Sequence, residues 1–196
     1  GGTIPLVADA QDKIRAACLL YNDKGERISR YDKIHLFDVR LDNGAETYIE
    51  SETIEPGNQI VVVDTRFGRI GLAVCYDLRF PEQFRLMLAE EVEFIVLPSA
   101  FTAITGRAHW EVLVRARAIE NLCYVVAAAQ GGYHVNGRET HGDSMIVDPW
   151  GNIVDRLARG SGFVLADIDL KQIQSIRENF PALLHRRINI GNHDDG

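Results

Sequence analysis

The sequence predicts a single α/β domain. Between residues 69 and 130, segments with strand character alternate with segments of helical periodicity, in the order strand, helix, strand, helix, strand. This alternation is typical of helices layered on a β-sheet. The chain has 196 residues, 46% of them apolar, and a chain of this length buries roughly 70% of the surface that its unfolded form exposes. Such a core needs neither metal ions nor disulfide bonds, which excludes a disulfide-rich miniprotein.

Charge and cysteine content restrict the partners and the compartment. The 28 acidic and 21 basic side chains give a net charge of −7, which argues against broad affinity for nucleic acid or for anionic membranes. The three cysteines, Cys18, Cys75 and Cys123, lie far apart in apolar runs, which suits a reducing compartment such as the cytoplasm. No apolar run approaches the roughly 18 residues of a membrane span. Binding or conversion of a small molecule therefore remains a possible function.

The first part of the chain predicts a β-hairpin and a long loop. Residues 1–5, which lack an initiator Met, lead directly into strand-like sequence. Residues 13–21 are apolar and end at an Asn-Asp-Lys-Gly turn, after which residues 27–31 form the second strand of the hairpin. Residues 33–58 are charged and show no regular pattern. A stretch of this length is expected to be a functional loop.

From residue 59 onward the sequence predicts the layered part of the domain. Residues 59–65 and 69–75 are rich in β-branched side chains and form a strand pair, whose second strand delivers Cys75. Pro81 opens a helix over residues 81–90. The remaining expected elements are a strand over 94–98, an amphipathic helix over 109–122 with Leu113, Ala116 and Ile119 on one side, a strand over 123–130, short strands over 144–147, 153–157 and 162–168, a helix from about Asp169 and a loose tail over 189–196.

Cys75 is the candidate nucleophile. It lies at the end of a buried strand and before a helix, where backbone N–H groups, the helix dipole and the nearby Arg79 favour a thiolate. Taken alone, however, a cysteine is more often a small buried side chain than a nucleophile. Cys18 and Cys123 lie inside uninterrupted apolar strands and are expected to be core residues.

A cysteine nucleophile that attacks a carbonyl needs a base and a group that stabilises the oxyanion. Lys33 lies among apolar neighbours directly after a strand, where it could be partly desolvated, although taken alone such a lysine is more often a solvated loop residue. His35 is an alternative base. Spacing alone does not separate Glu50 from the other carboxylates of the long loop, which are Glu46, Glu52 and Glu55.

The sequence gives little support for a metal or a cofactor. The six histidines form neither an H-x-x-x-H nor an H-E-x-x-H spacing, which are the patterns of zinc sites on helices. The glycines at 131–132 and 160–162 do not stand between a strand and a helix as a dinucleotide fingerprint requires. We therefore expect no cofactor.

Two segments resemble motifs of a known enzyme superfamily. Residues 31–38, Tyr-Asp-Lys-Ile-His-Leu-Phe-Asp, resemble the lysine motif of the nitrilase (carbon–nitrogen hydrolase) superfamily, and residues 71–82, Gly-Leu-Ala-Val-Cys-Tyr-Asp-Leu-Arg-Phe-Pro-Glu, resemble its cysteine motif. Residues 99–130 and the ending His-Arg-Arg at 185–187 look most like the branch that contains deaminated glutathione amidase, with ω-amidase as its near relative. Further matches, which extend the resemblance over nearly the whole chain, lie at 98–101, 105–106, 109–111, 116–121, 142–144 and 148–151.

The resemblance implies a fold and a set of roles. It implies a four-layer α-β-β-α sandwich and a homodimer or higher homo-oligomer. It also implies a carbon–nitrogen hydrolase domain over residues 1–196 that corresponds to the last two thirds of a complete member. Cys75 becomes the nucleophile, Lys33 the ammonium that stabilises the oxyanion, and Glu50 the carboxylate that positions Lys33. The resemblance also implies that the Tyr76 backbone N–H contacts the oxyanion and that Arg79 and Phe80 belong to the set of oxyanion and substrate contacts. For a carboxylate on the substrate, Arg107 is an alternative cation to Arg79.

One residue of the family pattern has no match. The first glutamate of the family, its general base, falls in the N-terminal strand and helices that would precede residue 1. We therefore expect residues 1–196 alone to hydrolyse amides more slowly than a chain extended upstream, because a general base contributes about 10²–10⁴-fold.

The functional prediction is a hydrolase of non-peptide carbon–nitrogen bonds in small linear amides, similar to deaminated glutathione amidase. Two alternatives within the superfamily are an ω-amidase and an N-carbamoyl amide hydrolase. An alternative from a different functional class is a non-catalytic binding module on the same fold. The pair of Lys33 and Cys75 speaks against that module, because binding alone requires neither residue.

Overall fold

The computed structural model describes residues 2–41, 46–135 and 137–188. The tail predicted over residues 189–196 lies outside this part of the chain. Within it, no helix has the length and apolar character needed to cross a lipid bilayer.

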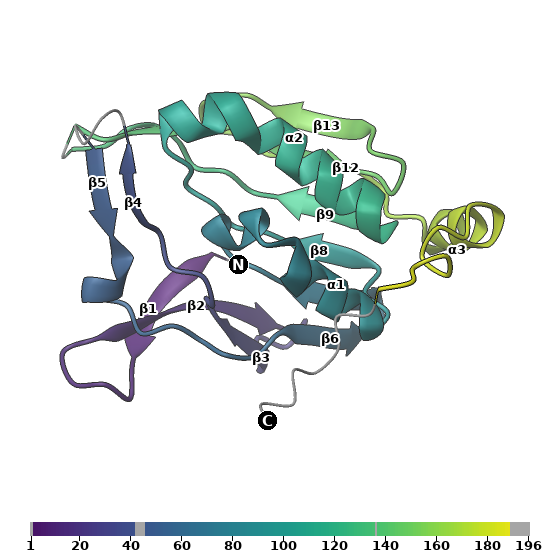
Figure 1. Ribbon diagram of the computed structural model, residues 1–196, viewed down its shortest axis with the longest axis horizontal. Helices are drawn as coiled ribbons and strands as arrows, with labels where there is room; N and C mark the ends of the chain where they lie inside the picture. The colour runs from purple at the N-terminus through teal and green to yellow at the C-terminus, as the bar shows by residue number, and fades with distance from the viewer. Residues whose placement is uncertain (1, 42–45, 136, 189–196) are drawn as a thin grey trace.

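A six-stranded mixed sheet forms the centre of the domain (Figure 1). Its strands run in the order β13-β12-β9-β8-β7-β6. The middle strands β7, β8 and β9 are parallel, while β6, β12 and β13 join them in antiparallel pairs. The bounds of these strands are Val61–Thr65 for β6, Gly68–Leu72 for β7, Phe94–Val96 for β8, Tyr124–Ala127 for β9, Ser144–Val147 for β12 and Ile153–Leu157 for β13.

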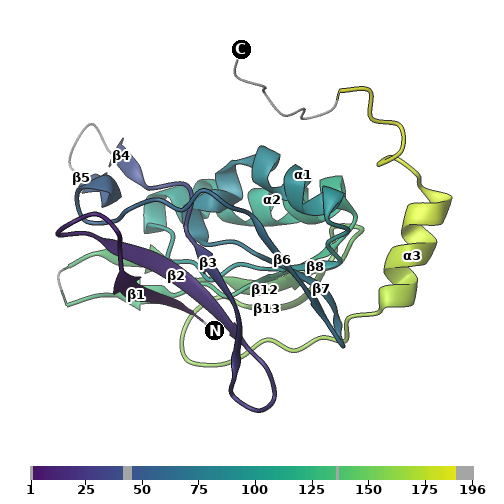
Figure 2. The same cartoon turned by 90° about the horizontal axis from the view of Figure 1, so that it is seen from below.

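Two helices cover one face of this sheet, and a second sheet packs on the other (Figure 2). The helices are α1 (Pro81–Ala89) and α2 (Ala103–Asn121). The antiparallel second sheet contains β1 (Thr3–Val7), β2 (Ile14–Tyr21) and β3 (Arg27–Asp32). These are three layers of the predicted α-β-β-α sandwich, and the hairpin predicted from residues 13–31 is confirmed.

Two hydrophobic clusters hold the layers together. The first, under the helices, is built around the fully buried side chains of Phe84, Trp110 and Ile95. The second joins the two sheets and includes Cys18 and Tyr31. Cys18 and Cys123 are 3% and 0% exposed, so the prediction that both are core residues is confirmed.

Helix α2 differs from its prediction in the residue at which it begins and in the side that is buried. It begins at Ala103, where the Thr102 side chain accepts a hydrogen bond from the Thr105 N–H as the N-cap. The buried stripe contains Trp110, Val114 and Ala118, whereas Ile119 is 46% exposed. The predicted side of the helix was therefore wrong, because apolar residues occur on both sides and their periodicity alone does not select the face that meets the sheet.

The predicted irregular loop over residues 33–58 contains regular structure. It forms an antiparallel hairpin of β4 (Asp38–Leu41) and β5 (Glu46–Ile49), followed by a 3₁₀ helix over Glu50–Glu52. The prediction of irregular structure was wrong because these strands are only half-buried on alternate residues, so they lack the continuous apolar run of a core strand.

The starts of the two other helices agree with the predictions, whereas two predictions about strands do not. Helix α1 begins at Pro81 as predicted, and α3 (Leu170–Asn179) begins after Asp169, whose carboxylate caps it. Residues 162–168 are not assigned to a strand, so that prediction was wrong; their Leu165 N–H is bound by the Asp155 carboxylate rather than by a neighbouring strand. The short hairpin of β10 (Gly131–Tyr133) and β11 (Glu139–His141) was not predicted.

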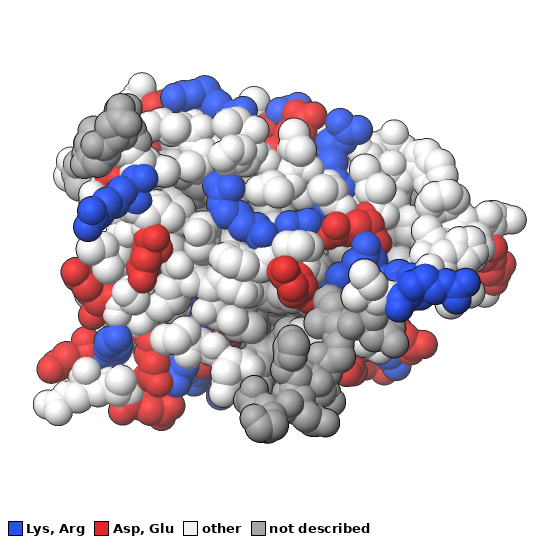
Figure 3. Space-filling model, viewed as in Figure 1, with Lys and Arg blue, Asp and Glu red and all other residues white. Residues whose placement is uncertain are grey.

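The charged groups on the face seen in Figure 3 are mixed. Acidic side chains gather near the corner where β1 and β5 lie, and basic side chains cross the middle of the face beside α1. This face therefore has no continuous basic surface of the kind that polyanion binding requires.

Candidate active site

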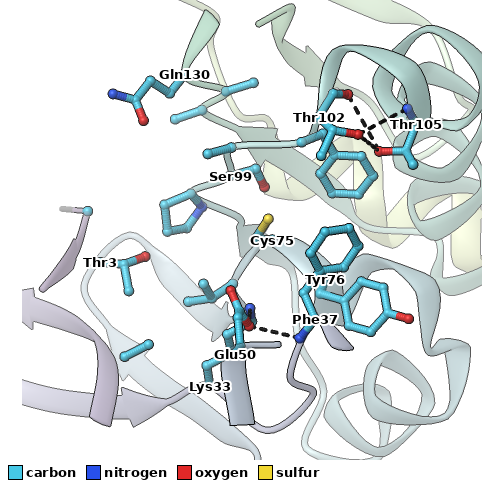
Figure 4. A pocket seen from close by; sticks show the side chains of 18 of the residues that line it. Thr3, Lys33, Phe37, Glu50, Cys75, Tyr76, Ser99, Thr102, Thr105 and Gln130 are labelled. Carbon is cyan, nitrogen blue, oxygen red and sulfur yellow. Dashed lines mark hydrogen bonds and ion pairs between the residues drawn. The ribbon is translucent and has the colours of Figure 1, made fainter. Parts of the chain in front are cut away.

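A cavity of about 600 Å³ lies where the loop after β7 meets the segments that follow β3 and β8. Figure 4 shows the Cys75 sulfur pointing into it, between Ser99 on one side and Glu50 with Lys33 on the other. The lining includes the predicted site residues Lys33, Glu50, Cys75, Tyr76 and Arg79 and, from outside the prediction, Ser99, Ala100, Thr102, Gln130 and Arg138.

Cys75 stands on a sharp turn rather than in a strand. Strand β7 ends at Leu72, and Cys75 is the first residue of a 3₁₀ helix that ends at Arg79. Its φ of +51° is in the left-handed region, which a side chain with a Cβ adopts only when its surroundings hold it there. The Cys75 N–H donates to the Pro98 carbonyl at 3.0 Å. The prediction that the strand itself delivers Cys75 is corrected: the turn aims the thiol into the cavity.

Tyr76 follows Cys75 at the start of the same 3₁₀ helix. Backbone N–H groups in the first turn of a helix have no acceptor within it, so the Tyr76 N–H is placed where it can donate to a ligand beside the thiol. The Tyr76 ring packs edge-on against Phe37 and Phe80 at centroid distances of 4.9 and 5.2 Å.

Lys33 is buried and ion-paired. Only 2% of it is exposed, and its Nζ forms an ion pair with Glu50. Gly57 holds this segment in place by donating its N–H to the Lys33 carbonyl at 2.8 Å. A Cβ at Gly57 would lie 2.2 Å from the Asp32 carbonyl oxygen, so the close approach requires glycine. The interpretation of Lys33 as a solvated loop lysine is therefore wrong.

The hairpin β4–β5 decides which glutamate reaches Lys33. Asp38 pairs with Ile49, so Glu50, the next residue, lies beside Phe37 and accepts its N–H at 2.8 Å. The other glutamates of the segment lie elsewhere: Glu46 accepts from the Tyr48 hydroxyl, Glu52 is exposed, and Glu55 pairs with Arg15.

Burial raises the pKa of the Cys75 thiol above its ordinary value. The Lys33 ammonium, a hydrogen bond from the Ala100 N–H and the Arg138 guanidinium each oppose this shift, whereas the Glu50 carboxylate adds to it. The electrostatic state of the thiol therefore depends on how closely Lys33 is held to it.

Phe80 and His35 lie outside the cavity lining. Their rings stack on each other, with centroids 3.7 Å apart and planes 5° apart. The His35 Nδ1 lies 2.9 Å from the Asp77 carboxylate. The structure therefore gives no support to Phe80 as a substrate contact or to His35 as the base of Cys75, because the two rings pack together and His35 is turned toward Asp77.

Arg79 lines the cavity and Arg107 does not. The Arg79 guanidinium lies over the Phe101 ring at 5.1 Å, and burial lowers its pKa. Arg107 lines a separate cavity of about 300 Å³ with Glu139. The alternative of Arg107 as a cation at this site is therefore wrong, because α2 turns it toward β11.

Arg138 is a cation of the cavity that the sequence did not predict. It immediately precedes β11, and a hydrogen bond from the His141 N–H to the Phe101 carbonyl (2.9 Å) ties β11 to the segment after β8. Arg138 donates through Nη2 to the Ala100 carbonyl at 2.8 Å, and its guanidinium lies 5.2 Å from the Tyr48 ring centroid. No local pattern marks it, because only the packing of β11 brings it to Cys75.

Among the described residues, no cluster of three or more His, Cys, Asp or Glu side chains has an arrangement that would hold a metal ion.

Comparisons with known proteins show which family the chain is similar to. The family model described as carbon–nitrogen hydrolase matches residues 1–178. Two similar proteins are the deaminated glutathione amidases of Yersinia enterocolitica, 44% identical over 95% of this chain, and of Homo sapiens, 48% identical over 89%. Among solved structures, the C. elegans NitFhit protein is 43% identical with a TM-score of 0.84 over 90% of this chain and 43% of its own. Saccharomyces cerevisiae Nit3, a member of branch 10 of the nitrilase superfamily, is 34% identical with a TM-score of 0.83 over 96% of this chain and 65% of its own.

The chain spans 65% of the length of the Yersinia relative and 54% of the human one. The family model nevertheless covers both segments that carry the lysine and the cysteine of the cavity. Fold, motifs and similarity thus agree: the chain belongs to the carbon–nitrogen hydrolase family.

Proposed function

We propose that the protein is an amidase that hydrolyses the non-peptide carbon–nitrogen bond of a small linear amide through a thioester on Cys75. The observation that supports this most is the meeting of the Cys75 thiol, the buried Lys33 ammonium and the Glu50 carboxylate in one cavity. The relatives named deaminated glutathione amidase favour an amide of that kind.

The first half of the proposed reaction forms the thioester. A carboxylate takes the Cys75 proton; the resemblance assigns this base to a glutamate before residue 1. The Cys75 sulfur then bonds to the amide carbonyl carbon, and the carbonyl π electrons move to oxygen. Lys33 and the Tyr76 N–H stabilise this oxyanion. The C–N bond breaks as the nitrogen takes the proton from the base, so ammonia or an amine leaves.

The second half releases the acid. Water gives a proton to the same base and bonds through oxygen to the thioester carbon, which again places negative charge beside Lys33. The C–S bond then breaks, the sulfur recovers the proton and a carboxylic acid departs. Glu50 holds the Lys33 ammonium throughout, through its ion pair and its anchor on the Phe37 N–H.

The proposed substrate carries a carboxylate. Besides the Lys33 ammonium, which is ion-paired to Glu50, the cavity lining contains the guanidinium groups of Arg79 and Arg138. Glu50 is the one carboxylate among the described residues of that lining. An arginine binds a carboxylate through charge-assisted hydrogen bonds, so an anionic amide matches the cavity better than a neutral one.

The direct test is release of ammonia from a panel of amides. Deaminated glutathione, α-ketoglutaramate and an N-carbamoyl compound separate the leading function from the ω-amidase and carbamoyl alternatives. We expect the highest kcat/KM with deaminated glutathione. If a chain extended upstream releases nothing from the panel, and its Cys75 reacts with iodoacetamide no faster than free cysteine, the protein is instead a binding module.

Replacing Arg138 with methionine is expected to raise KM for a carboxylate-bearing amide by about 10–100-fold, because a hydrogen bond between charged groups contributes about 1.5–3 kcal/mol. Steady-state kinetics measure the change. A neutral amide of similar size is the control substrate, and Arg107→Met removes a cation from outside the cavity. Equal losses on charged and neutral amides would contradict carboxylate recognition by Arg138.

We also propose a cytoplasmic homodimer. The three cysteines are free thiols, which suits a reducing compartment. On the outer side of α2, Val112 is 68% exposed and Ile119 is 46% exposed. The family resemblance implies a homodimer, so we propose that a second copy of the chain covers this side of α2. Sedimentation velocity measures this directly, and the mass of a single chain at micromolar concentration would contradict it.

A further inference from the structure

Asp77 is a fully buried carboxylate that the proposed mechanism does not use. It lies in the 3₁₀ helix that begins with Cys75 and is 0% exposed. Among the described cavity-lining residues it does not appear, so it does not face the substrate. A buried carboxylate is costly unless its oxygens are bonded, and its contacts therefore indicate what it does.

The Asp77 carboxylate joins two segments that are far apart in the sequence. Oδ2 accepts from the Val74 N–H at 2.8 Å, immediately before Cys75. Oδ1 accepts from the His35 N–H at 3.1 Å, two residues after Lys33. The His35 ring adds Nδ1 at 2.9 Å from the same oxygen. One carboxylate thus bonds the backbone beside the thiol and the backbone beside the ammonium.

Tyr31 makes a second connection between the same segments. Its hydroxyl donates to Asp77 Oδ2 at 2.6 Å and accepts from the Ile34 N–H at 3.2 Å. The Gln83 side chain in α1 donates to that hydroxyl at 2.9 Å. Tyr31 is 0% exposed and Gln83 3%. Burial and the adjacent Asp77 carboxylate raise the pKa of Tyr31, so the hydroxyl keeps the proton that it donates.

We propose that Asp77 is a positioning residue of the amidase: with Tyr31, it clamps the Cys75 turn to the Lys33 segment and so fixes the thiol against the ammonium. The proposal rests on the proposed function, since it assigns the clamp to that reaction. Cys75 needs such support because its φ of +51° is unfavourable for a residue with a Cβ. Lys33 needs it because its segment leaves β3 at Asp32 and enters the hairpin β4–β5 only at Asp38.

Asp77→Asn is the primary test. A carboxylate accepts all four contacts, whereas an asparagine amide of the same shape has one oxygen and an NH₂ group that cannot accept. We expect the two segments then to separate by up to about 1 Å. Since a displacement of about 1 Å can cost 10²-fold in rate, we expect kcat to fall by about 10²-fold with KM changed less than about threefold.

The rate at which iodoacetamide alkylates Cys75 is the second readout, because it reports on the thiol without any turnover. Lys33 and Arg138 favour the thiolate and Glu50 opposes it, while Arg79 is a further cation near the sulfur. Loss of the clamp moves the Lys33 segment away from the thiol, together with Glu50, which is ion-paired to Lys33 and accepts from the Phe37 N–H. Lys33 affects the pKa of Cys75 more than Glu50 does, so the net result is a higher pKa of the thiol. We expect alkylation to slow by about 10-fold near neutral pH, the equivalent of one pKa unit, with the pH profile displaced to higher pH. Peptide mass spectrometry assigns the product to Cys75.

Asp148→Asn is the matched control. Asp148 is also a buried aspartate, 7% exposed, whose carboxylate holds a turn through the Trp150 and Asn152 N–H groups at 2.9 Å. It lies outside the cavity lining. We expect a comparable loss of melting temperature with kcat and the alkylation profile unchanged. If Asp148→Asn lowers both as much as Asp77→Asn does, the effect is general destabilisation and the proposal is overturned.

Tyr31→Phe keeps the test decisive if Asp77→Asn fails to fold. It removes one hydroxyl from the clamp, and we expect both readouts to fall by about threefold. The double variant Tyr31→Phe/Asp77→Asn is expected to lose no more than Asp77→Asn alone, because the Tyr31 hydroxyl connects the Lys33 segment to the Cys75 turn through its hydrogen bond to Asp77. Wild-type alkylation and turnover in Tyr31→Phe and in any folded Asp77→Asn would overturn the proposal.

The two readouts separate failure of this inference from failure of the proposed function. A wild-type protein that hydrolyses no amide contradicts the function, while a slowed Cys75 alkylation in Asp77→Asn still supports the clamp. Conversely, an active wild type whose alkylation and kcat are unaffected by Asp77→Asn keeps the function and removes the clamp.

Discussion

Cys75→Ala is expected to reduce amide turnover by about 10⁴-fold or more, because no thioester can form without the Cys75 sulfur. The measurement is ammonia release under single-turnover conditions, together with mass spectrometry of the intact protein. The wild type is expected to show a transient increase in mass equal to the acyl group, and Cys75→Ala none. We expect this variant to fold, since alanine is smaller than cysteine and the backbone N–H of residue 75 can still donate to the Pro98 carbonyl.

Cys18→Ala and Cys123→Ala are the matched controls for this prediction. Both remove a thiol from the core, at 3% and 0% exposure, and neither residue lines the cavity. We expect both to lose some stability and to keep wild-type kcat. Turnover in Cys75→Ala within tenfold of wild type would contradict Cys75 as the nucleophile.

Lys33→Met is expected to lower kcat by about 10²–10³-fold, the usual cost of losing one group that stabilises an oxyanion. The ammonium also lowers the pKa of Cys75. Its removal therefore raises that pKa, leaves less thiolate at a given pH and displaces the alkylation profile to higher pH. Steady-state kinetics and the pH dependence of Cys75 alkylation measure the two effects separately.

The double variant Lys33→Met/Glu50→Gln controls for the carboxylate that Lys33→Met leaves without its ion pair. We expect the double variant to recover melting temperature relative to Lys33→Met, because an unpaired, partly buried charge is costly. It is not expected to recover turnover. Recovery of turnover in the double variant would mean that the ammonium serves only to neutralise Glu50.

Elements stabilised by local contacts could be predicted from the sequence, whereas elements stabilised by contacts with distant segments could not. Helix α1 and strands β6 to β9 were predictable because proline at a helix start and runs of β-branched residues act locally. The hairpin β4–β5 and the buried side of α2 were not, since half-buried strands and helices with apolar residues on both sides are decided by what packs against them. The same reason explains why residues 162–168, rich in strand-forming residues, pair with no strand.

The sequence, through its resemblance to the lysine and cysteine motifs of the family, was sufficient to predict the pair of residues on which the proposed chemistry depends. Lys33 and Cys75 each sit in a contiguous motif, so their identity needs no knowledge of distant contacts. Tertiary structure decided what surrounds them: the pairing of Asp38 with Ile49 selects Glu50 from its neighbours, and the packing of β11 brings in Arg138. The hydrogen bonds that join Asp77, a residue of the cysteine motif, to His35 of the lysine motif are likewise not predictable from the sequence. Each of these depends on strand register and side-chain packing between segments far apart in sequence, which no local pattern encodes.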